Sequence, residues 1–168
     1  MDHLFTPWRM NYITGATKPP DGSCIFCGKQ HGTPESDARD LIIGRSEHVY
    51  VMLNLFPYSS GHLMVIPYEH VATQEGFPPA LLTDIMLTVN KALAALRQVY
   101  APHGFNLGVN LGAAAGAGIA AHYHFHVVPR WSGDANFMTA VGDTRVIPEA
   151  MDVAYAKLRA AWGSETHR

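Results

Sequence analysis

The pattern of apolar positions along the chain becomes regular near residue 40. Residues 1–38 are broken up by proline and glycine, which predicts an irregular N-terminal segment. Three short apolar runs then follow at 41–43, 48–54 and 62–67, separated by turn residues. Because no connection between these runs is long enough for a crossover helix, they predict an antiparallel meander.

A long helix and two further strands complete the pattern. Between 79 and 100, apolar residues recur every three or four positions, which predicts one helical face made of Leu82, Ile85, Met86, Val89, Leu93, Leu96 and Tyr100. Residues 105–111 and 122–130 alternate as strands, and Pro148 is suited to begin a second helix over 148–163. This order predicts a single α+β domain over 1–168, in which residues 39–131 form a mainly antiparallel five-stranded sheet and the long helix.

Composition narrows the class of function. Of the 168 residues, 48% are apolar and 15% charged, and the formal net charge is −2, which favours a globular enzyme or binding domain over a protein that binds nucleic acid or anionic membranes. The longest weakly polar stretch, 107–121, is broken by glycines, so we expect no membrane span. Two cysteines and no secretory leader pattern lead us to expect a protein of the reducing cytoplasm.

Histidine is the unusual residue type, with ten copies against twelve lysines and arginines. His122, His124 and His126 alternate along one predicted strand, so their side chains share a face at intervals of about 7 Å. Three readings of this row stay open: a solvated sheet face, a catalytic metal site, and nucleophilic attack on phosphorus by one neutral imidazole. The other five histidines outside the motifs, at 3, 31, 48, 103 and 167, show no usable spacing and are expected at the surface.

The motif around these histidines resembles the signature of the histidine triad (HIT) superfamily of nucleotide hydrolases and transferases. Further segments resemble the family as well, and those at 6–13 and 129–137 are similar to a bacterial branch that includes diadenosine tetraphosphate phosphorylases. The others are Asn54-x-x-Pro57, Gly61-His62 through His70, and Asn110-Leu111-Gly112. The likeness covers nearly the whole chain.

The resemblance implies a role for each matching residue. His124 would be the nucleophile that forms a nucleotidyl-histidine intermediate on the α-phosphate of a dinucleoside polyphosphate, while His126 would contact phosphate or leaving group and His122 would brace the strand. Further residues would bind the substrate, namely Asn54, Asn110, Gly116, Gly118 and Trp131. Asn54 and Asn110 are equally typical of turns and caps, and Trp131 of a core residue. No organic cofactor is implied.

One position departs from the family pattern. Many relatives carry Gln, Ser or Thr four residues before the first histidine, whereas this chain has Gly118. Backbone N–H groups would then bind the phosphate without a side-chain donor, and either water or phosphate could serve as the acceptor. Alternative functions are hydrolysis of nucleoside phosphoramidates or adenylylated molecules, or nucleotide binding with little turnover.

The resemblance also implies a structural zinc site and a homodimer. In some branches Cys-x-x-Cys joins a distant histidine and the first triad histidine, and here these would be Cys24, Cys27, His70 and His122. Reduced thiols without metal, or a redox pair, are the alternatives for the two cysteines. The family fold implies two sheets joined side by side, with the two predicted helices as candidates for the interface.

Overall fold

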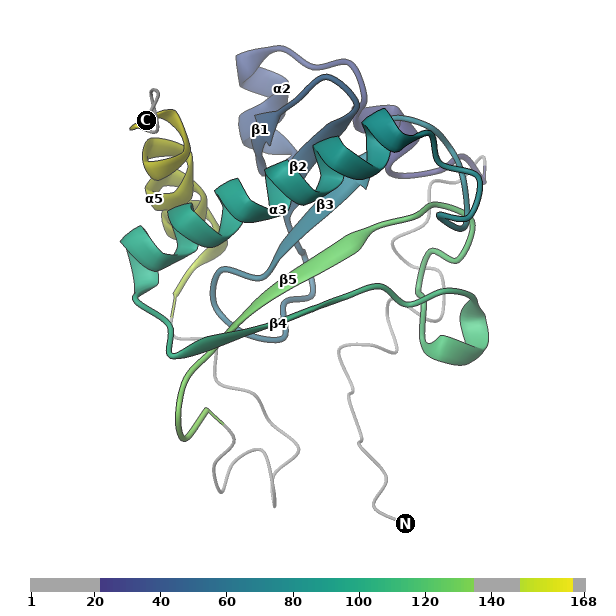
Figure 1. Cartoon of the computed structure of the whole chain (residues 1–168). Helices are drawn as coiled ribbons and strands as arrows, with labels where there is room; N and C mark the ends of the chain where they lie inside the picture. Colours follow the sequence, from purple (N-terminus) through teal and green to yellow (C-terminus); the bar gives the residue numbers. More distant parts are fainter. Residues whose placement is uncertain (1–21, 135–148, 165–168) are drawn as a thin grey trace.

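One five-stranded antiparallel sheet, in the order β1-β2-β3-β5-β4, forms the centre of the molecule (Figure 1). The computed structural model describes residues 22–134 and 149–164. The strands are β1 (Ile42–Arg45), β2 (Val49–Leu53), β3 (Leu63–Pro67), β4 (Gly104–Gly108) and β5 (Phe125–Arg130). The predicted α+β class and antiparallel meander are confirmed.

Helix α3 (Pro79–Tyr100) lies across one face of the sheet, and α5 (Met151–Ser164) packs against α3 and β1 (Figure 1). The main hydrophobic core lies between these helices and the sheet, where Val51 and Val65 form a cross-strand pair. At β1, the indole of Trp162 lies against Gly44, and a Cβ at position 44 would fall 2.0 Å from it. The predicted long helix is therefore confirmed, whereas Pro148 lies outside the described residues.

The buried face of α3 is rotated from the one that the sequence predicts. Ile85, Val89 and Leu96 are buried as expected, but Leu82 and Met86 are 39% and 48% exposed. Leu81 is buried instead, together with Ala92 and Ala95, and the small side chains of the two alanines let the helix approach the sheet closely. Apolar residues occupy two adjacent faces of this helix. The spacing of the large residues alone therefore predicted a face that is only partly the buried one.

Among the described residues, α3 alone is long and apolar enough to cross a membrane, by length and composition only. The sequence had led us to expect no such segment. Core helices of soluble proteins commonly meet the same two criteria. Here the inner face of α3 packs on β2, β3 and β5, so the structure accounts for its apolar character through the core.

A second, smaller core lies on the sheet face opposite α3. Met52 of β2 and Met64 of β3 are partners in register, and both belong to this cluster with Phe26 and Tyr50. The N-terminal segment that covers it contains a 3-10 turn, η1 (Cys27–Lys29), and a short helix, α2 (Pro34–Arg39). The expectation that residues 1–38 are irregular is therefore wrong for 34–38.

The elements around the histidine row are shorter than predicted. β4 ends at Gly108, and residues 109–124 form a loop that contains the 3-10 turn η2 (Ala113–Ala115). β5 begins at Phe125, so only His126 of the three histidines lies within the strand. Glycine backbones with positive φ at positions 112 and 116 flank the η2 turn, which lies in the Gly/Ala-rich stretch between the two predicted strands.

Candidate active site

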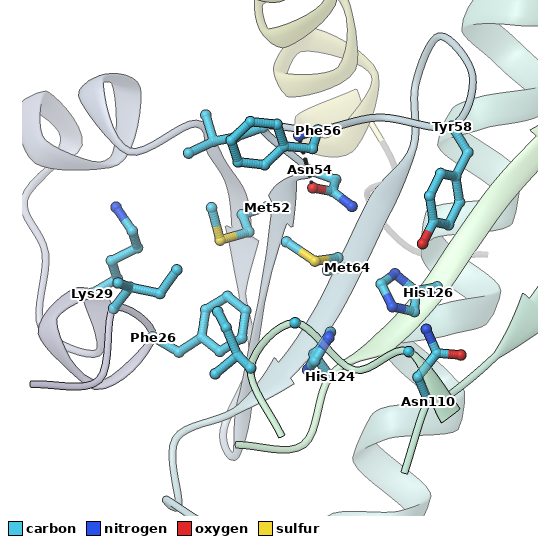
Figure 2. Close-up of a pocket in the computed structure, with 15 residues that line it drawn as sticks. Phe26, Lys29, Met52, Asn54, Phe56, Tyr58, Met64, Asn110, His124 and His126 are labelled. Carbon is cyan, nitrogen blue, oxygen red and sulfur yellow. Dashed lines mark hydrogen bonds between the residues drawn. The ribbon is translucent and has the colours of Figure 1, made fainter. Parts of the chain in front are cut away.

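A cavity of about 230 Å³ opens on the sheet face opposite α3 (Figure 2). The methionines of β2 and β3 form its floor, the N-terminal segment forms one wall, and the loop before β5 forms the other. The lining residues are Ile25, Phe26, Lys29, Met52, Asn54, Leu55, Phe56, Tyr58, Met64, Asn110, Gly116, Gly118, Ile119, His124 and His126. Two of the three predicted triad histidines therefore meet in one pocket with most of the predicted substrate-binding residues.

The backbone of His122 determines the tautomer of His124. The Nδ1 of His124 lies 2.8 Å from the carbonyl oxygen of His122, and since a carbonyl can only accept, Nδ1 carries the proton. Nε2 of the neutral ring then holds a lone pair on the side of the ring that is away from this bond. Burial lowers the pKa of His124 below its usual range, and the side chain is 5% exposed. This imidazole is thus neutral and nucleophilic at Nε2 near pH 7.

A second chain of hydrogen bonds determines the tautomer of His126. The backbone N–H of Tyr58 donates to Nδ1 of His62 at 3.1 Å, so the proton of neutral His62 is on Nε2. That Nε2 donates to Nδ1 of His126 at 3.0 Å. His126 in its neutral form therefore carries its own proton on Nε2 and can donate a hydrogen bond from that nitrogen.

His62 is a functional residue that sequence reasoning missed. It is fully buried and lies 64 positions from His126, so no local spacing connects the two. The sequence analysis placed it only in a turn segment that matches the family. A buried histidine next to an entirely apolar strand was the available signal, because such an imidazole needs a polar partner.

The two asparagines line the pocket in different ways. Oδ1 of Asn54 accepts the backbone N–H of Phe56 at 2.9 Å, which is the turn bond expected from the alternative reading of this residue. Its Nδ2 lies 3.4 Å from Nδ1 of His62, so Asn54 also connects the turn to the histidine chain. Asn110 follows β4 and lies beside His126 at the far end of the pocket (Figure 2).

The loop before β5 brings backbone rather than side chains to the pocket. Gly116, Gly118 and Ile119 all line it. The loop is folded by turns of its own, in which the N–H groups of Ala115 and Ala117 donate to the carbonyl of Gly112. Position 118 can offer a ligand only its backbone, as the sequence analysis expected for the phosphate side.

The apolar half of the pocket was not predicted. Phe26 from the N-terminal segment faces Phe56 across a floor of two methionines, with Lys29 at the end (Figure 2). Ile25 and Leu55 also line the pocket. These residues come from separate segments and have no motif of their own, so only the folded chain brings them together. Their flat, apolar surfaces suit an aromatic ring system.

Cys24, Cys27, His70 and His122 form a cluster, with their ligand atoms within 4.8 Å of one another. Sγ of Cys27 lies 3.1 Å from Nδ1 of His70, and Sγ of Cys24 lies 3.4 Å from Nδ1 of His122. Nε2 of His122 donates to the carbonyl of Pro67 at 2.9 Å, which leaves Nδ1 as the lone-pair atom that faces the cysteines. Two sulfurs and two imidazole nitrogens in this arrangement fit the donor set of a tetrahedral zinc site.

Trp131 does not line the pocket. Its ring packs edge-on against Tyr100 of α3, with ring centroids 6.4 Å apart. Among the histidines outside the motifs, His31 and His103 are exposed and His48 is half-buried, while His3 and His167 lie outside the described residues.

Residues 35–133 match the model of the HIT domain family. The chain is 40% identical to a protein of Mycobacterium tuberculosis named AP-4-A phosphorylase, over 98% of this chain and 86% of that one. A bis(5'-nucleosyl)-tetraphosphatase (asymmetrical) of Schizosaccharomyces pombe is 33% identical over 49% of this chain and 44% of its own length. Among solved structures, a zinc-bound histidine triad family protein from Mycobacterium smegmatis superposes with a TM-score of 0.66 at 29% identity, covering 84% of this chain and 94% of that one.

Proposed function

The chain belongs to the HIT domain family, and from that premise we propose that it is an enzyme that cleaves dinucleoside polyphosphates at the α-phosphate. One observation carries the proposal: His124 is buried in the pocket with Nδ1 donating to a carbonyl, so its Nε2 is available to attack phosphorus. The names of the two enzyme relatives, a phosphorylase and a tetraphosphatase, support the substrate class.

The reaction proceeds in two displacements. Nε2 of His124 forms a bond to the α-phosphorus while the bond from phosphorus to the bridging oxygen breaks. The Nε2–H of His126 donates a hydrogen bond to that oxygen, which stabilises its growing negative charge, and the nucleoside polyphosphate leaves as an anion. The positive charge that develops on His124 is stabilised by the carbonyl of His122, which keeps its hydrogen bond throughout.

The second displacement transfers the nucleotide to an acceptor. An oxygen of the acceptor attacks phosphorus, the bond to His124 breaks, and the imidazole returns to its neutral state. When water is the acceptor, the proton that it loses passes to solvent. With water the products from diadenosine tetraphosphate are AMP and ATP, whereas with inorganic phosphate they are ADP and ATP. Gly118 and the amide of Asn110 line the same pocket as His126, which supports a role for them in holding the phosphate oxygens. Gly116 also lines it, but its N–H already donates to the carbonyl of Ala113 at 3.0 Å.

The test traps the intermediate. Incubation with α-³²P-labelled diadenosine tetraphosphate and quenching in base should leave label on the wild-type protein. His124→Ala should abolish the label and lower kcat by a factor of about 10³ or more. His103→Ala, which alters an exposed histidine outside the pocket, is the control. Turnover unchanged in His124→Ala would overturn the proposal, and tight AMP binding with no product would favour a binding protein instead.

Zinc at the cysteine–histidine cluster is the second part of the proposal. A zinc ion there would supply structural cross-linking, and the zinc-bound relative supports this assignment. Protein purified without added metal should contain about one zinc ion per chain by elemental analysis. Cys27→Ser should lose the metal and lower the midpoint of thermal unfolding, whereas His31→Ala should change neither. Wild-type protein without zinc would contradict this part.

We also propose a single-domain homodimer that works in the cytoplasm. β4 is an edge strand with Leu107 45% exposed, which leaves a strand edge for a second sheet, and α3 exposes Leu87 at 62%. The paired thiols of the cluster suit a reducing compartment. Sedimentation equilibrium should give twice the chain mass of 18.4 kDa, and thermal unfolding should show one transition, as expected for a single domain. A monomer at micromolar concentration would contradict the dimer.

A further inference from the structure

The pocket has two chemically different ends (Figure 2). At one end His124, His126 and Asn110 gather, and at the other Lys29 lies beyond Phe26, with Asn54 between the two ends. If the α-phosphorus is at Nε2 of His124, the base must lie over the methionine floor, because only that half offers apolar surfaces on both sides. The edge of the base that is farthest from the phosphate then faces Lys29.

Lys29 is held in place by two separate contacts. Its ammonium donates to Oδ1 of Asp40 at 2.7 Å, and its side chain is 19% exposed. Its carbonyl accepts Nη2 of Arg45 at 2.9 Å, which fixes the backbone from the sheet side. An ammonium group has three donors and no acceptor, so after the bond to Asp40 two N–H groups remain for a ligand.

A donor-only group distinguishes the purines. The substituent at C6 is the point of a purine farthest from the ribose, and it is the acceptor O6 in guanine and hypoxanthine but an amino donor in adenine. Lysine can donate to O6 of a 6-oxopurine but must face the amino group of a 6-aminopurine. We propose that Lys29 is a specificity-determining residue that favours 6-oxopurine nucleotides over 6-aminopurine nucleotides; this rests on the proposed function for the orientation of the nucleotide.

The test compares two substrates in matched variants. The ratio of kcat/KM for diguanosine tetraphosphate to that for diadenosine tetraphosphate should fall about tenfold in Lys29→Met and recover in Lys29→Arg. Arg39→Met is the control, because Arg39 also pairs with Asp40 but has a 75% exposed side chain and does not line the pocket. An unchanged ratio, or an equal loss for both substrates, overturns the role of Lys29.

Mononucleotide binding to the wild-type protein keeps the inference testable if Lys29→Met does not fold. By calorimetry, 2-aminopurine riboside 5'-monophosphate should bind about tenfold more weakly than GMP, since it lacks the O6 acceptor, and equal affinity overturns the inference. This experiment also separates two failures. Absence of turnover with both tetraphosphates contradicts the proposed function, whereas normal turnover with no dependence on O6 or on Lys29 contradicts only the inference about the base.

Discussion

On one side of the pocket, residues 24–30 are held by side chains that reach out from the sheet, whereas on the other side residues 112–119 are held by turns within their own backbone. Tyr50 donates its hydroxyl to the carbonyl of Phe26 at 2.9 Å, and Arg45 donates to the carbonyls of Lys29 and Gln30. The opposite wall relies on bonds such as that from the N–H of Gly116 to the carbonyl of Ala113.

Under the proposed function, the difference implies that the two halves of the site recognise different parts of a ligand. The wall proposed to face the base has a fixed shape before anything binds, because its carbonyls accept hydrogen bonds from Tyr50 and Arg45 of the sheet. The wall proposed to face the phosphate consists of glycine and alanine up to Gly118, so its backbone can come close to anionic oxygens. Four substitutions would break or sharpen this contrast.

The largest effect is expected for Arg45→Met. Arg45 binds Asp37 through Nε and Nη2, and Asp37 is only 8% exposed, so the substitution leaves a buried carboxylate unpaired and two carbonyls without their donor. The free energy of unfolding in urea should fall by about 3 kcal/mol. Arg39→Met removes an exposed arginine that pairs with Asp40, and it should change the free energy of unfolding by less than about 0.5 kcal/mol. Equal effects would show that Arg45 has no special role in holding the wall.

Gly112→Ala should have the next largest effect. Gly112 has φ 81° and ψ 162°, a backbone conformation that is open essentially only to glycine. A Cβ there would meet nothing within 4 Å, so the cost comes from the backbone alone. We expect a loss of about 2 kcal/mol in the free energy of unfolding, or local opening of the loop seen as faster amide exchange. Gly108→Ala, which also has open space, is the control.

Tyr50→Phe tests a single bond in the wall that faces the base. The ring of Tyr50 stays buried while the carbonyl of Phe26 loses one of its two donors and keeps the N–H of Lys29 at 3.1 Å, which should lower the free energy of unfolding by about 1 kcal/mol. KM should rise more than kcat falls, because Phe26 lines the pocket without donating or accepting a proton. A fall in kcat with KM unchanged would contradict this assignment.

Gly118→Gln should change stability least, by less than about 0.5 kcal/mol, because Gly118 is exposed. It adds the side-chain donor that many relatives have near the phosphate. The measurement is the ratio of ADP to AMP formed from diadenosine tetraphosphate in the presence of phosphate. We expect this ratio to shift relative to wild type, and an unchanged ratio would show that position 118 does not influence the choice of acceptor.

Elements with a strong local pattern could be predicted from the sequence. β2 is buried at every position, and α3 repeats its apolar residues over 22 residues, so both are visible without tertiary information. α2 was missed because Pro34 was read as a loop residue. In the structure Pro34 is the first residue of a helix. Thr33 at its N-cap and Ser36 in its first turn form a reciprocal capping box.

The site was predictable where one motif carries it and unpredictable where distant segments meet. The residues of the triad and of the cysteine–histidine cluster follow from the family resemblance, although Cys24 and His122 are 98 positions apart. The bond between His62 and His126 and the placement of Lys29 at the base end depend on strand pairing and on the path of the N-terminal segment. No local spacing encodes either of them.

The composition of residues 112–118 has a consequence for the entropy of binding. Glycine and alanine have no side-chain rotamers to lose, so ordering this loop around a phosphate restricts the backbone alone. A loop with glutamine or lysine at the same positions would lose about 1.5–2 kcal/mol of rotamer freedom for each side chain that became fixed. In this protein, ordering this half of the pocket would therefore cost backbone freedom, which is greatest for glycine, but no side-chain rotamer freedom at residues 112–118.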